Sequence, residues 1–315
     1  MLTSLLTVYI ASSISPDFQT KTSTPRQNEV TSEITLTSFF TNSKAPIKEP
    51  QQIAPIINAK GSVAIDMKTG TVLYEKNSNT RMPMASITKL MTALIILEEQ
   101  ELSEVVTVSP NANNTGGSTM NLHNNEQITV ENLLRGLLIN SANDGAVALA
   151  EHNVKDKNKD AINPSIQYAP GTTSDFVDKM NKRAIELGLV NTHFANPTGL
   201  DHPNNYSSPY DLAKLGNYLY NNKLVKEIAQ IKETDVYSIS GDYTHHLTST
   251  NELLGGYLHI KGLKTGSTEA AGNCLVSIAE NDSGNEILTV VLSSPARFEE
   301  TKILIDWVFR SYNWQ

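Results

Sequence analysis

The sequence predicts an α/β (α+β) fold in which both ends of the folded part supply strands to one sheet. Strand-like apolar runs occur at 61–77 and again at 272–280 and 286–294, and segments with helical periodicity lie between them. Because the strands lie at both ends, the first and the last of them are expected to meet in space. The 315 residues, 39% of them hydrophobic, are enough for one large domain or two small ones.

The first 57 residues differ in composition from the rest. The run Leu5–Ile14 (LLTVYIASSI) is mostly apolar, but its ten residues are too few to span a membrane, which takes about 20. It fits the apolar core of a signal peptide, although no basic residue precedes it, and a frayed hydrophobic N-terminus is the alternative. Residues 15–57 are rich in Thr, Ser, Pro, Gln and Asn, as flexible linkers are. We therefore expect a signal-like segment and linker over 1–57, one folded domain over 58–315, and export of the protein from the cytoplasm.

Charge and cysteine content exclude several kinds of partner. The net charge is −8 and no cluster of Lys and Arg stands out, so nucleic acid is not an expected partner. Cys274 is the single cysteine, which rules out an internal disulfide and a cysteine-based metal site. Its apolar surroundings (GNCLVSIA) predict a position in the core.

Local signals assign the other elements in chain order. The stretch 61–77 is expected to form two strands joined by a turn at 68–70. Thr129 suits a helix N-cap, and Pro209 suits the first turn of a helix. Residues 155–174 are polar and indicate a surface insertion. Helices are expected at 86–100, 130–139, from 143 onward, at 173–189, 207–222 and 303–315, and a further strand at 235–240.

The stretch MASITKLMTAL (84–94) places Ser86 three residues before Lys89, at the start of an apolar helix. Positions i and i+3 share one face of a helix, so the lysine amine would rest near the serine hydroxyl. A buried lysine is unfavourable unless it has a chemical role. This single S-x-x-K therefore indicates a serine nucleophile with a lysine base.

Two further motifs each occur more than once. The surrounding sequence distinguishes the copy that could be functional from the copies with an ordinary structural explanation. S-x-N is found five times, but only Ser141–Asn143 lies at a polar junction between two apolar helices. K-T-G is found at Lys68 and at Lys264. The copy at Lys68 lies at the expected hairpin tip, where Thr-Gly is ordinary turn chemistry. The copy at Lys264 precedes a strand among small residues, which would let a ligand approach the backbone.

The order S-x-x-K, S-x-N, K-T-G is the signature of penicillin-binding proteins and class A β-lactamases. Residues 58–315 resemble the low-molecular-mass penicillin-binding proteins of the D-alanyl-D-alanine carboxypeptidase family, serine peptidases S11. The stretches that carry the resemblance are NPTGLD (196–201), YSSPYDLAKL (206–215), KTGSTEAAGNCLV (264–276) and SSPARFEETKILIDW (293–307). The resemblance implies a β-lactamase/transpeptidase-like fold: an antiparallel sheet flanked by helices, plus a mostly helical lobe, with the site between them.

The resemblance also implies an activity: removal of the last D-Ala from peptidoglycan stem peptides through an acyl-serine, with β-lactams as inhibitors and no metal or organic cofactor. The implied roles are nucleophile (Ser86), base (Lys89), proton bridge (Ser141), holder of the substrate amide (Asn143), recognition of the terminal carboxylate (Lys264, Thr265), space for it (Gly266) and oxyanion hole (the N–H groups of Ser86 and Ser267). Lys89 must be neutral to act as a base, and both burial and a nearby cation such as Lys264 would lower its pKa.

Several features depart from the family pattern. Ala142 stands where many relatives have Gly, and Ser267 follows K-T-G where some have His. Many relatives add a C-terminal β-rich domain and an amphipathic anchor. Without these, membrane attachment is expected only through the N-terminus, if at all.

Other functions stay open at this point. A D,D-endopeptidase would use the same residues, and a catalytically dead wall-binding protein would lack one of them. A class A β-lactamase needs a further glutamate to activate the deacylating water. Glu186 is a poor candidate, because it lies on the side of an amphipathic helix that is expected to face solvent. The chain has no H-E-x-x-H and no G-x-S-x-G, and its seven histidines are expected in surface or loop positions.

Overall fold

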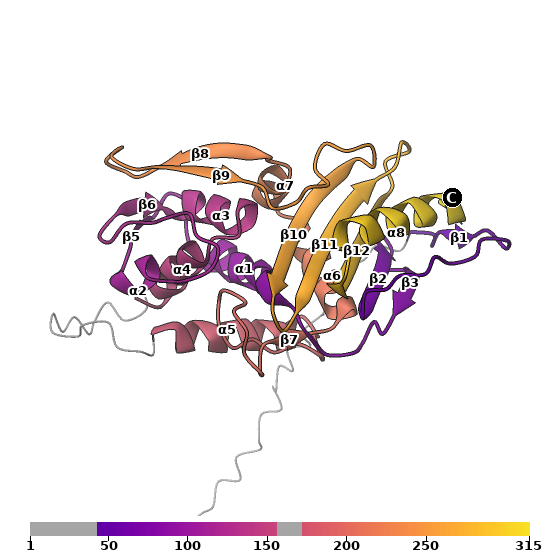
Figure 1. Cartoon of the computed structure of the whole chain (residues 1–315), viewed down its shortest axis with the longest axis horizontal. Helices are drawn as coiled ribbons and strands as arrows, with labels where there is room; N and C mark the ends of the chain where they lie inside the picture. Colours follow the sequence, from indigo (N-terminus) through magenta and orange to yellow (C-terminus); the bar gives the residue numbers. More distant parts are fainter. Residues whose placement is uncertain (1–42, 156–171) are drawn as a thin grey trace, which may run out of the picture. The chain divides into compact units, whose positions relative to one another are not determined.

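The structure, a computed structural model, describes residues 43–155 and 172–315 (Figure 1). Its strands are β1 (Ile47–Lys48), β2 (Gly61–Asp66), β3 (Val72–Lys76), β4 (Met82–Pro83), β5 (Val105–Thr107), β6 (Gln127–Thr129), β7 (Tyr206–Ser207), β8 (Glu233–Tyr237), β9 (Thr244–Thr248), β10 (Ile260–Thr268), β11 (Gly272–Glu280), β12 (Glu286–Ser294) and β13 (Tyr312–Asn313). Its helices are the 3₁₀ turn η1 (Ala85–Thr88) and α1 (Lys89–Glu99), α2 (Pro110–Asn113), α3 (Val130–Ile139), α4 (Asn143–Lys155), α5 (Thr172–Glu186), α6 (Pro209–Tyr220), α7 (Lys223–Ala229) and α8 (Arg297–Ser311).

The main sheet is antiparallel, with the strand order β10-β11-β12-β2-β3. β2 pairs with β12 and sets Val63 opposite Val290, so the first and last strands meet as the sequence predicts. The predicted β2–β3 hairpin is also confirmed. At its turn, Asp66 Oδ2 accepts a 2.8 Å hydrogen bond from the N–H of Thr69. Gly70 supplies the positive φ of 72° that the turn requires.

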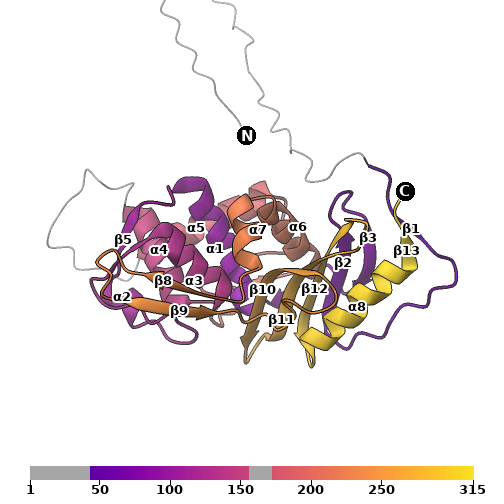
Figure 2. The ribbon, with the colours of Figure 1, turned by 90° about the horizontal axis from the view of Figure 1, so that it is seen from above.

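Helices cover both faces of this sheet, as Figures 1 and 2 show. α8 lies on one face, where Leu304 shares a buried cluster with Leu275 of β11 and Val291 of β12. α6 lies on the other face, where a Cβ on Gly216 would stand 3.0 Å from Leu288 Cδ1. Since both faces are buried, the central strands are apolar almost throughout, which explains the continuous apolar runs in the sequence.

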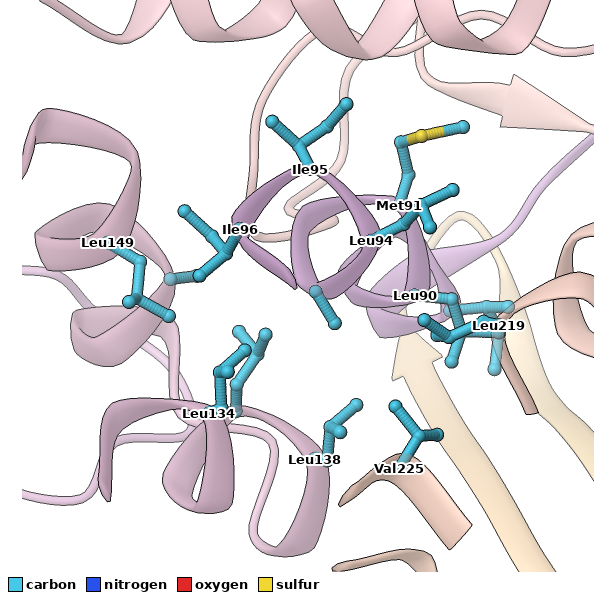
Figure 3. Close-up of a cluster of buried hydrophobic side chains, with 14 of the residues drawn as sticks. Leu90, Met91, Leu94, Ile95, Ile96, Leu134, Leu138, Leu149, Leu219 and Val225 are labelled. Carbon is cyan, nitrogen blue, oxygen red and sulfur yellow. The ribbon is translucent and has the colours of Figure 1, made fainter. Parts of the chain in front are cut away.

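The helical lobe is built around α1. The apolar side chains of α1 point in several directions and are nearly all buried, among partners from α3, α4, α6 and α7 (Figure 3). The residues labelled there are Leu90, Met91, Leu94, Ile95, Ile96, Leu134, Leu138, Leu149, Leu219 and Val225. A helix that is apolar on all sides is buried on all sides. The first turn of α1 is therefore held on a rigid element.

One strand was missed and the C-terminal helix was misplaced. K-T-G at Lys264 precedes β11, as expected, but it also lies within β10, which was not predicted as a strand. The C-terminal helix spans Arg297–Ser311 and not 303–315. In both cases the local sequence lacks a clear period, and packing against the sheet decides the structure.

The stretch assigned to the linker is partly structured. β1 pairs with β13, and Ile57 is 2% exposed in the core beside α8. Residues 1–42, with the signal-like run, and residues 156–171 of the expected insertion lie outside the described residues, so those predictions are untested.

Cys274 lies in the core, as predicted from its apolar neighbours. Burial raises the pKa of its thiol to about 11, so it is not a thiolate at neutral pH. Along residues 43–155 and 172–315, none of the helices has the length and apolar content needed to cross a bilayer.

Candidate active site

Ser86 lies on η1, the short turn that leads into α1 and packs against β10. Its neighbours Met84, Ala85 and Ile87 are all buried and anchor the turn, whereas Ser86 itself is partly exposed. Ala85 takes a positive φ of 50°, which is unusual for a residue with a side chain. Strained backbone of this kind is held in place by its surroundings and is common at functional sites.

Lys89 is fully buried, and its Nζ lies at the centre of a three-point contact. It is 3.0 Å from Ser86 Oγ, 2.6 Å from Asn143 Oδ1 and 2.6 Å from the backbone oxygen of Thr198. As an ammonium, Nζ donates to all three oxygens. As a neutral amine it donates to the carbonyl oxygens of Asn143 and Thr198, and its lone pair faces the Ser86 hydroxyl. In this neutral form it can take the serine proton.

The electrostatic surroundings of Lys89 favour the same protonation state. Burial, followed by the charge of Lys264, lowers the pKa of Lys89 well below its ordinary value of 10.5. Asp144 opposes this and raises the pKa. Desolvation disfavours the ammonium, because no carboxylate of the described residues forms an ion pair with Nζ to compensate for lost water.

The Ser141–Asn143 stretch forms the predicted polar junction between α3 and α4. Thr129 caps α3, as predicted, by accepting a 3.2 Å hydrogen bond from the N–H of Asn132. Ser141 takes a positive φ of 67°, and its buried Oγ has no hydrogen-bond partner among the described residues. Asn143 turns inward, and its Nδ2 donates to Gly116 O at 2.7 Å. Ser141 is thus an unpaired polar group at the site, and the structure gives it no hydrogen bond to the Lys89 amine.

K-T-G lies on β10, the edge strand of the sheet that faces the helical lobe. Lys264 is 1% exposed, and its Nζ donates to Thr265 O at 3.1 Å. Burial, with the Arg297 guanidinium as the second cause, lowers the pKa of Lys264 to about 7. The Thr265 hydroxyl lies 2.5 Å from the hydroxyl of Thr250.

Gly266 and Ser267 complete this strand beside η1. A Cβ on Gly266 would stand 2.9 Å from Ser86 N, so only glycine lets β10 and the serine turn approach this closely. Ser267 is exposed, and its Oγ donates to Asn273 Oδ1 at 3.1 Å. Because β10 is an edge strand, every second backbone N–H and C=O group points away from β11.

The structure places Ser86, Lys89 and Asn143 in direct contact. It sets Gly266 beside the Ser86 N–H, but it gives Ser141 no hydrogen bond to these residues.

Four further residues, for which the sequence predicted no role, lie beside the predicted ones. Thr198 supplies the oxygen that accepts from Lys89, and Asn196 Oδ1 shapes that turn by accepting from the N–H groups of Thr198 and Gly199. Thr250 contacts Thr265, and Arg297 Nη1 donates to Gly266 O at 2.9 Å. The N-P-T-G and S-P-A-R stretches contained three of these residues, but no spacing rule pointed to their roles.

Gly199 is expected to be essential for placing the serine turn. It has a φ of +86°, and a Cβ there would stand 2.1 Å from Ala85 O. Gly241 offers a matched control, since it has a φ of +80° with nothing within 4 Å of the added Cβ. By urea denaturation, Gly241→Ala is expected to lower the free energy of unfolding by about 1 kcal/mol. Gly199→Ala should lower it by about 2 kcal/mol more, because of the clash. Equal losses in the two variants would show that the contact with Ala85 is not tight.

Other candidates from the sequence lie outside this site. Lys68 is at the β2–β3 turn, as expected of ordinary turn chemistry. Glu186, the weighed lactamase glutamate, is exposed on α5 and pairs with Arg183 at 3.0 Å. His245, expected at the surface or in a loop, is instead buried on β9, because Glu126 pairs with it. Among the described residues, no group of His, Cys, Asp and Glu could hold a metal ion.

A five-stranded antiparallel sheet between helices, a helical lobe and a Ser-Lys pair at their junction define the transpeptidase-like class of serine enzymes. The crystal structure of the Streptomyces K15 DD-transpeptidase superposes with a TM-score of 0.73 at 31% identity, over 82% of this chain and 99% of the other. Residues 48–296 match the profile of the Peptidase S11 family, described as D-alanyl-D-alanine carboxypeptidase.

Two curated relatives agree with this match. The D-alanyl-D-alanine carboxypeptidase DacF of Bacillus subtilis is 36% identical over 261 residues, which cover 81% of this chain and 63% of the relative. DacA of Haemophilus influenzae is 31% identical over 272 residues, covering 82% and 63%. The protein belongs to the S11 family of serine peptidases, and it spans just under two thirds of the length of these relatives.

Proposed function

We propose that the protein is a serine-type D-Ala-D-Ala carboxypeptidase that removes the terminal D-Ala from peptidoglycan stem peptides and is acylated by β-lactams. The observation that carries this proposal is the fully buried Lys89 amine, 3.0 Å from the hydroxyl of Ser86, with a lowered pKa. A hydroxyl becomes a useful nucleophile only when a nearby base takes its proton.

In the proposed acylation, Ser86 Oγ attacks the carbonyl carbon of the last peptide bond while its proton passes to Lys89 Nζ. The tetrahedral oxyanion is stabilised by the backbone N–H groups of Ser86 and Ser267. Collapse breaks the C–N bond, and the D-Ala amine leaves with a proton that the unpaired Ser141 hydroxyl relays from Lys89. Water then attacks the acyl carbon and gives a proton to Lys89. Lys89 returns a proton to Ser86 Oγ as the ester bond breaks and the shortened peptide leaves.

Asn143 is proposed to hold the amide of the donor peptide, and the edge strand β10 to pair with its backbone. An extended peptide can add to a free sheet edge because unpaired N–H and C=O groups are already in register for it. Gly266 lets β10 lie close against the serine turn, and this sets the free strand edge next to Ser86. Ala142 is fully buried and faces the Gly136 and Gly145 backbones, so its methyl does not enter the cleft.

The terminal carboxylate is proposed to bind at Lys264 and Thr265, with Arg297 adding positive charge. The pKa of about 7 for Lys264 applies to the free site. A bound carboxylate would raise this pKa again, since an opposite charge favours the ammonium form. Carboxylate binding and protonation of Lys264 therefore support each other.

The proposed substrate places the enzyme outside the cytoplasm. The signal-like run in residues 1–57 fits this location, and we propose that residues 58–315 form the catalytic domain. N-terminal attachment to the membrane is compatible with the proposal but is not needed for the chemistry.

Release of D-Ala from an N-acylated peptide ending in D-Ala-D-Ala tests the function. We expect release from the free acid and little from the C-terminal amide, because only the acid carries the charge that Lys264 recognises. Lys264→Met should lower kcat/KM for the acid by about 10–100-fold and shrink the preference for acid over amide. In the wild type, KM should rise above pH 7 as the free enzyme loses the Lys264 proton.

The exposed Lys182 gives a matched control, since Lys182→Met should leave both peptides unaffected. Cleavage of a cross-linked dimer with no release from the pentapeptide would favour a D,D-endopeptidase. No cleavage of either substrate by folded protein would contradict the proposal.

A further inference from the structure

The segment 116–122, between α2 and β6, lies directly against the S-A-N motif. Its backbone oxygens hold Asn143 from two sides: Gly116 O accepts from Asn143 Nδ2 at 2.7 Å, and Ser118 O accepts from the Asn143 N–H at 2.7 Å. A Cβ on Gly117 would stand only 2.6 Å from Asn143 Nδ2. The position of the Asn143 amide therefore depends on the position of this segment.

The far end of the segment is fixed by two buried groups. Asp144 accepts hydrogen bonds from the N–H groups of Met120 and Leu122, at 3.1 and 3.0 Å. Met120 O in turn lies 2.8 Å from Nδ1 of His245 on β9. The β9 strand of the β8–β9 hairpin thus contacts segment 116–122 through the Met120 carbonyl.

His245 faces a hydrogen-bond acceptor at each ring nitrogen. Nδ1 points at Met120 O, and Nε2 lies 2.7 Å from Glu126 Oε1. Both side chains of the pair are nearly inaccessible, at 3% for His245 and 0% for Glu126. A neutral imidazole donates from only one nitrogen, so it would leave a lone pair facing one of these acceptors. Only the imidazolium satisfies both contacts.

The charged groups around the ring favour this form. Burial by itself lowers the pKa of His245, but Glu126, the Met120 carbonyl and Asp144 together outweigh burial and raise it. The other oxygen of Glu126, Oε2, accepts a 2.9 Å hydrogen bond from the N–H of His123. The His123 ring lies 6.5 Å from the His245 ring and stacks on Tyr243.

We propose that His245, as an imidazolium paired with Glu126, is a positioning residue that fixes segment 116–122 and through it the substrate-binding amide of Asn143. The proposal rests on the function proposed above for Asn143. When pH rises through the pKa of His245, one of its two hydrogen bonds is lost. The segment then loosens, and acylation of Ser86 slows.

The test is the second-order rate of acylation by benzylpenicillin, measured against pH for the wild type and for His245→Gln. Glutamine donates from one atom only, so it resembles neutral histidine. The ratio of wild-type to variant rates is expected to be about 10 at pH 6, a typical loss for a misplaced binding group. It should fall towards 1 at pH 9. Contributions of Lys89 and Lys264 to the pH profile cancel in this ratio. A ratio that does not change with pH would overturn the proposal, since loss of packing alone has no pH dependence.

The neighbouring His246 provides the matched control. It is exposed on the same strand and pairs with Asp235 at 2.8 Å, so His246→Gln should give a ratio near 1 at every pH. If His245→Gln does not fold, Glu126→Gln serves instead. It removes the carboxylate that raises the pKa of His245, so the fall in rate should move to lower pH.

Two measurements keep this proposal separate from the proposed function. Nitrogen-15 shifts of the His245 ring should show both nitrogens protonated at pH 6. Hydrogen exchange at the amides of Met120 and Leu122 should be faster in His245→Gln than in the wild type. If penicillin does not acylate the wild type, the enzymatic function fails while these two results still decide the role of His245. A neutral ring at pH 6, or unchanged exchange, would overturn it.

Discussion

Replacing Ser86 by Ala is expected to abolish covalent capture of benzylpenicillin. The wild-type protein should gain the full mass of the drug, because opening the β-lactam ring forms the ester without releasing a leaving group. Ser86 is the partly exposed hydroxyl that lies 3.0 Å from the Lys89 amine, whereas the Oγ of Ser141 is buried. The measurement is intact mass against time, at a fixed drug concentration, for both proteins.

An exposed serine gives the control for this experiment. Ser283→Ala, in the turn between β11 and β12, should be acylated like the wild type. An adduct that persists in Ser86→Ala would contradict the assignment of the nucleophile. Rapid hydrolysis of the drug without a lasting adduct would instead indicate a β-lactamase, although Glu186 is paired with Arg183 on the exposed side of α5.

The parts of the fold that could be predicted are those with a local physical signal. α1 was predictable because its apolar run exceeds a strand in length, and the β2–β3 hairpin because Asp66 and Gly70 have the chemistry of a tight turn. β10 was not predicted as a strand. Its two glycines and two lysines interrupt the apolar pattern, and Gly262 lies at an irregularity in the pairing. Its strand form depends on pairing with β11, which is a tertiary effect.

The contacts within the site also fall into those with a local signal and those without one. The contact of Ser86 with Lys89 follows from helical spacing alone, since the two residues are three positions apart. The contacts of Lys89 with Asn143 and Thr198 span 54 and 109 residues of chain. No periodicity encodes such distances, so the ordered set of three motifs was the signal that Lys89 and Asn143 meet. Thr198 lies outside these motifs and had no predicted role. Arg297 had no predicted role, and only its hydrogen bond to Gly266 O on β10 reveals its place at the site.

Replacing Lys89 is expected to slow acylation by about 10³-fold, within the range for loss of a general base. Lys89→Met keeps the apolar stem but has no lone pair, and Lys89→Arg keeps a charge that is not lost at accessible pH. In the wild type the rate should rise with pH as Lys89, whose pKa is lowered, loses its proton. Below that pKa the amine is protonated and cannot accept the proton of Ser86. The rising part of this pH–rate profile, its acid limb, should be absent in both variants. The measurement is the rate of acylation by penicillin from pH 5 to 10.

The exposed Lys182 again provides the control for removal of a lysine. Lys182→Met should keep the wild-type acylation rate and the wild-type rise of that rate with pH. Circular dichroism establishes that the Lys89 variants are folded, so that a low rate reports on chemistry. If Lys89→Met kept an acid limb with the wild-type midpoint, another group would be the base. The alternative would then be the second buried amine, Lys264, whose pKa of about 7 also falls in the measured range. Comparing the midpoint of the limb in Lys264→Met decides between them. With Lys89 as base, removing Lys264 takes away a cation that lowers the pKa of Lys89, so the midpoint must move to higher pH.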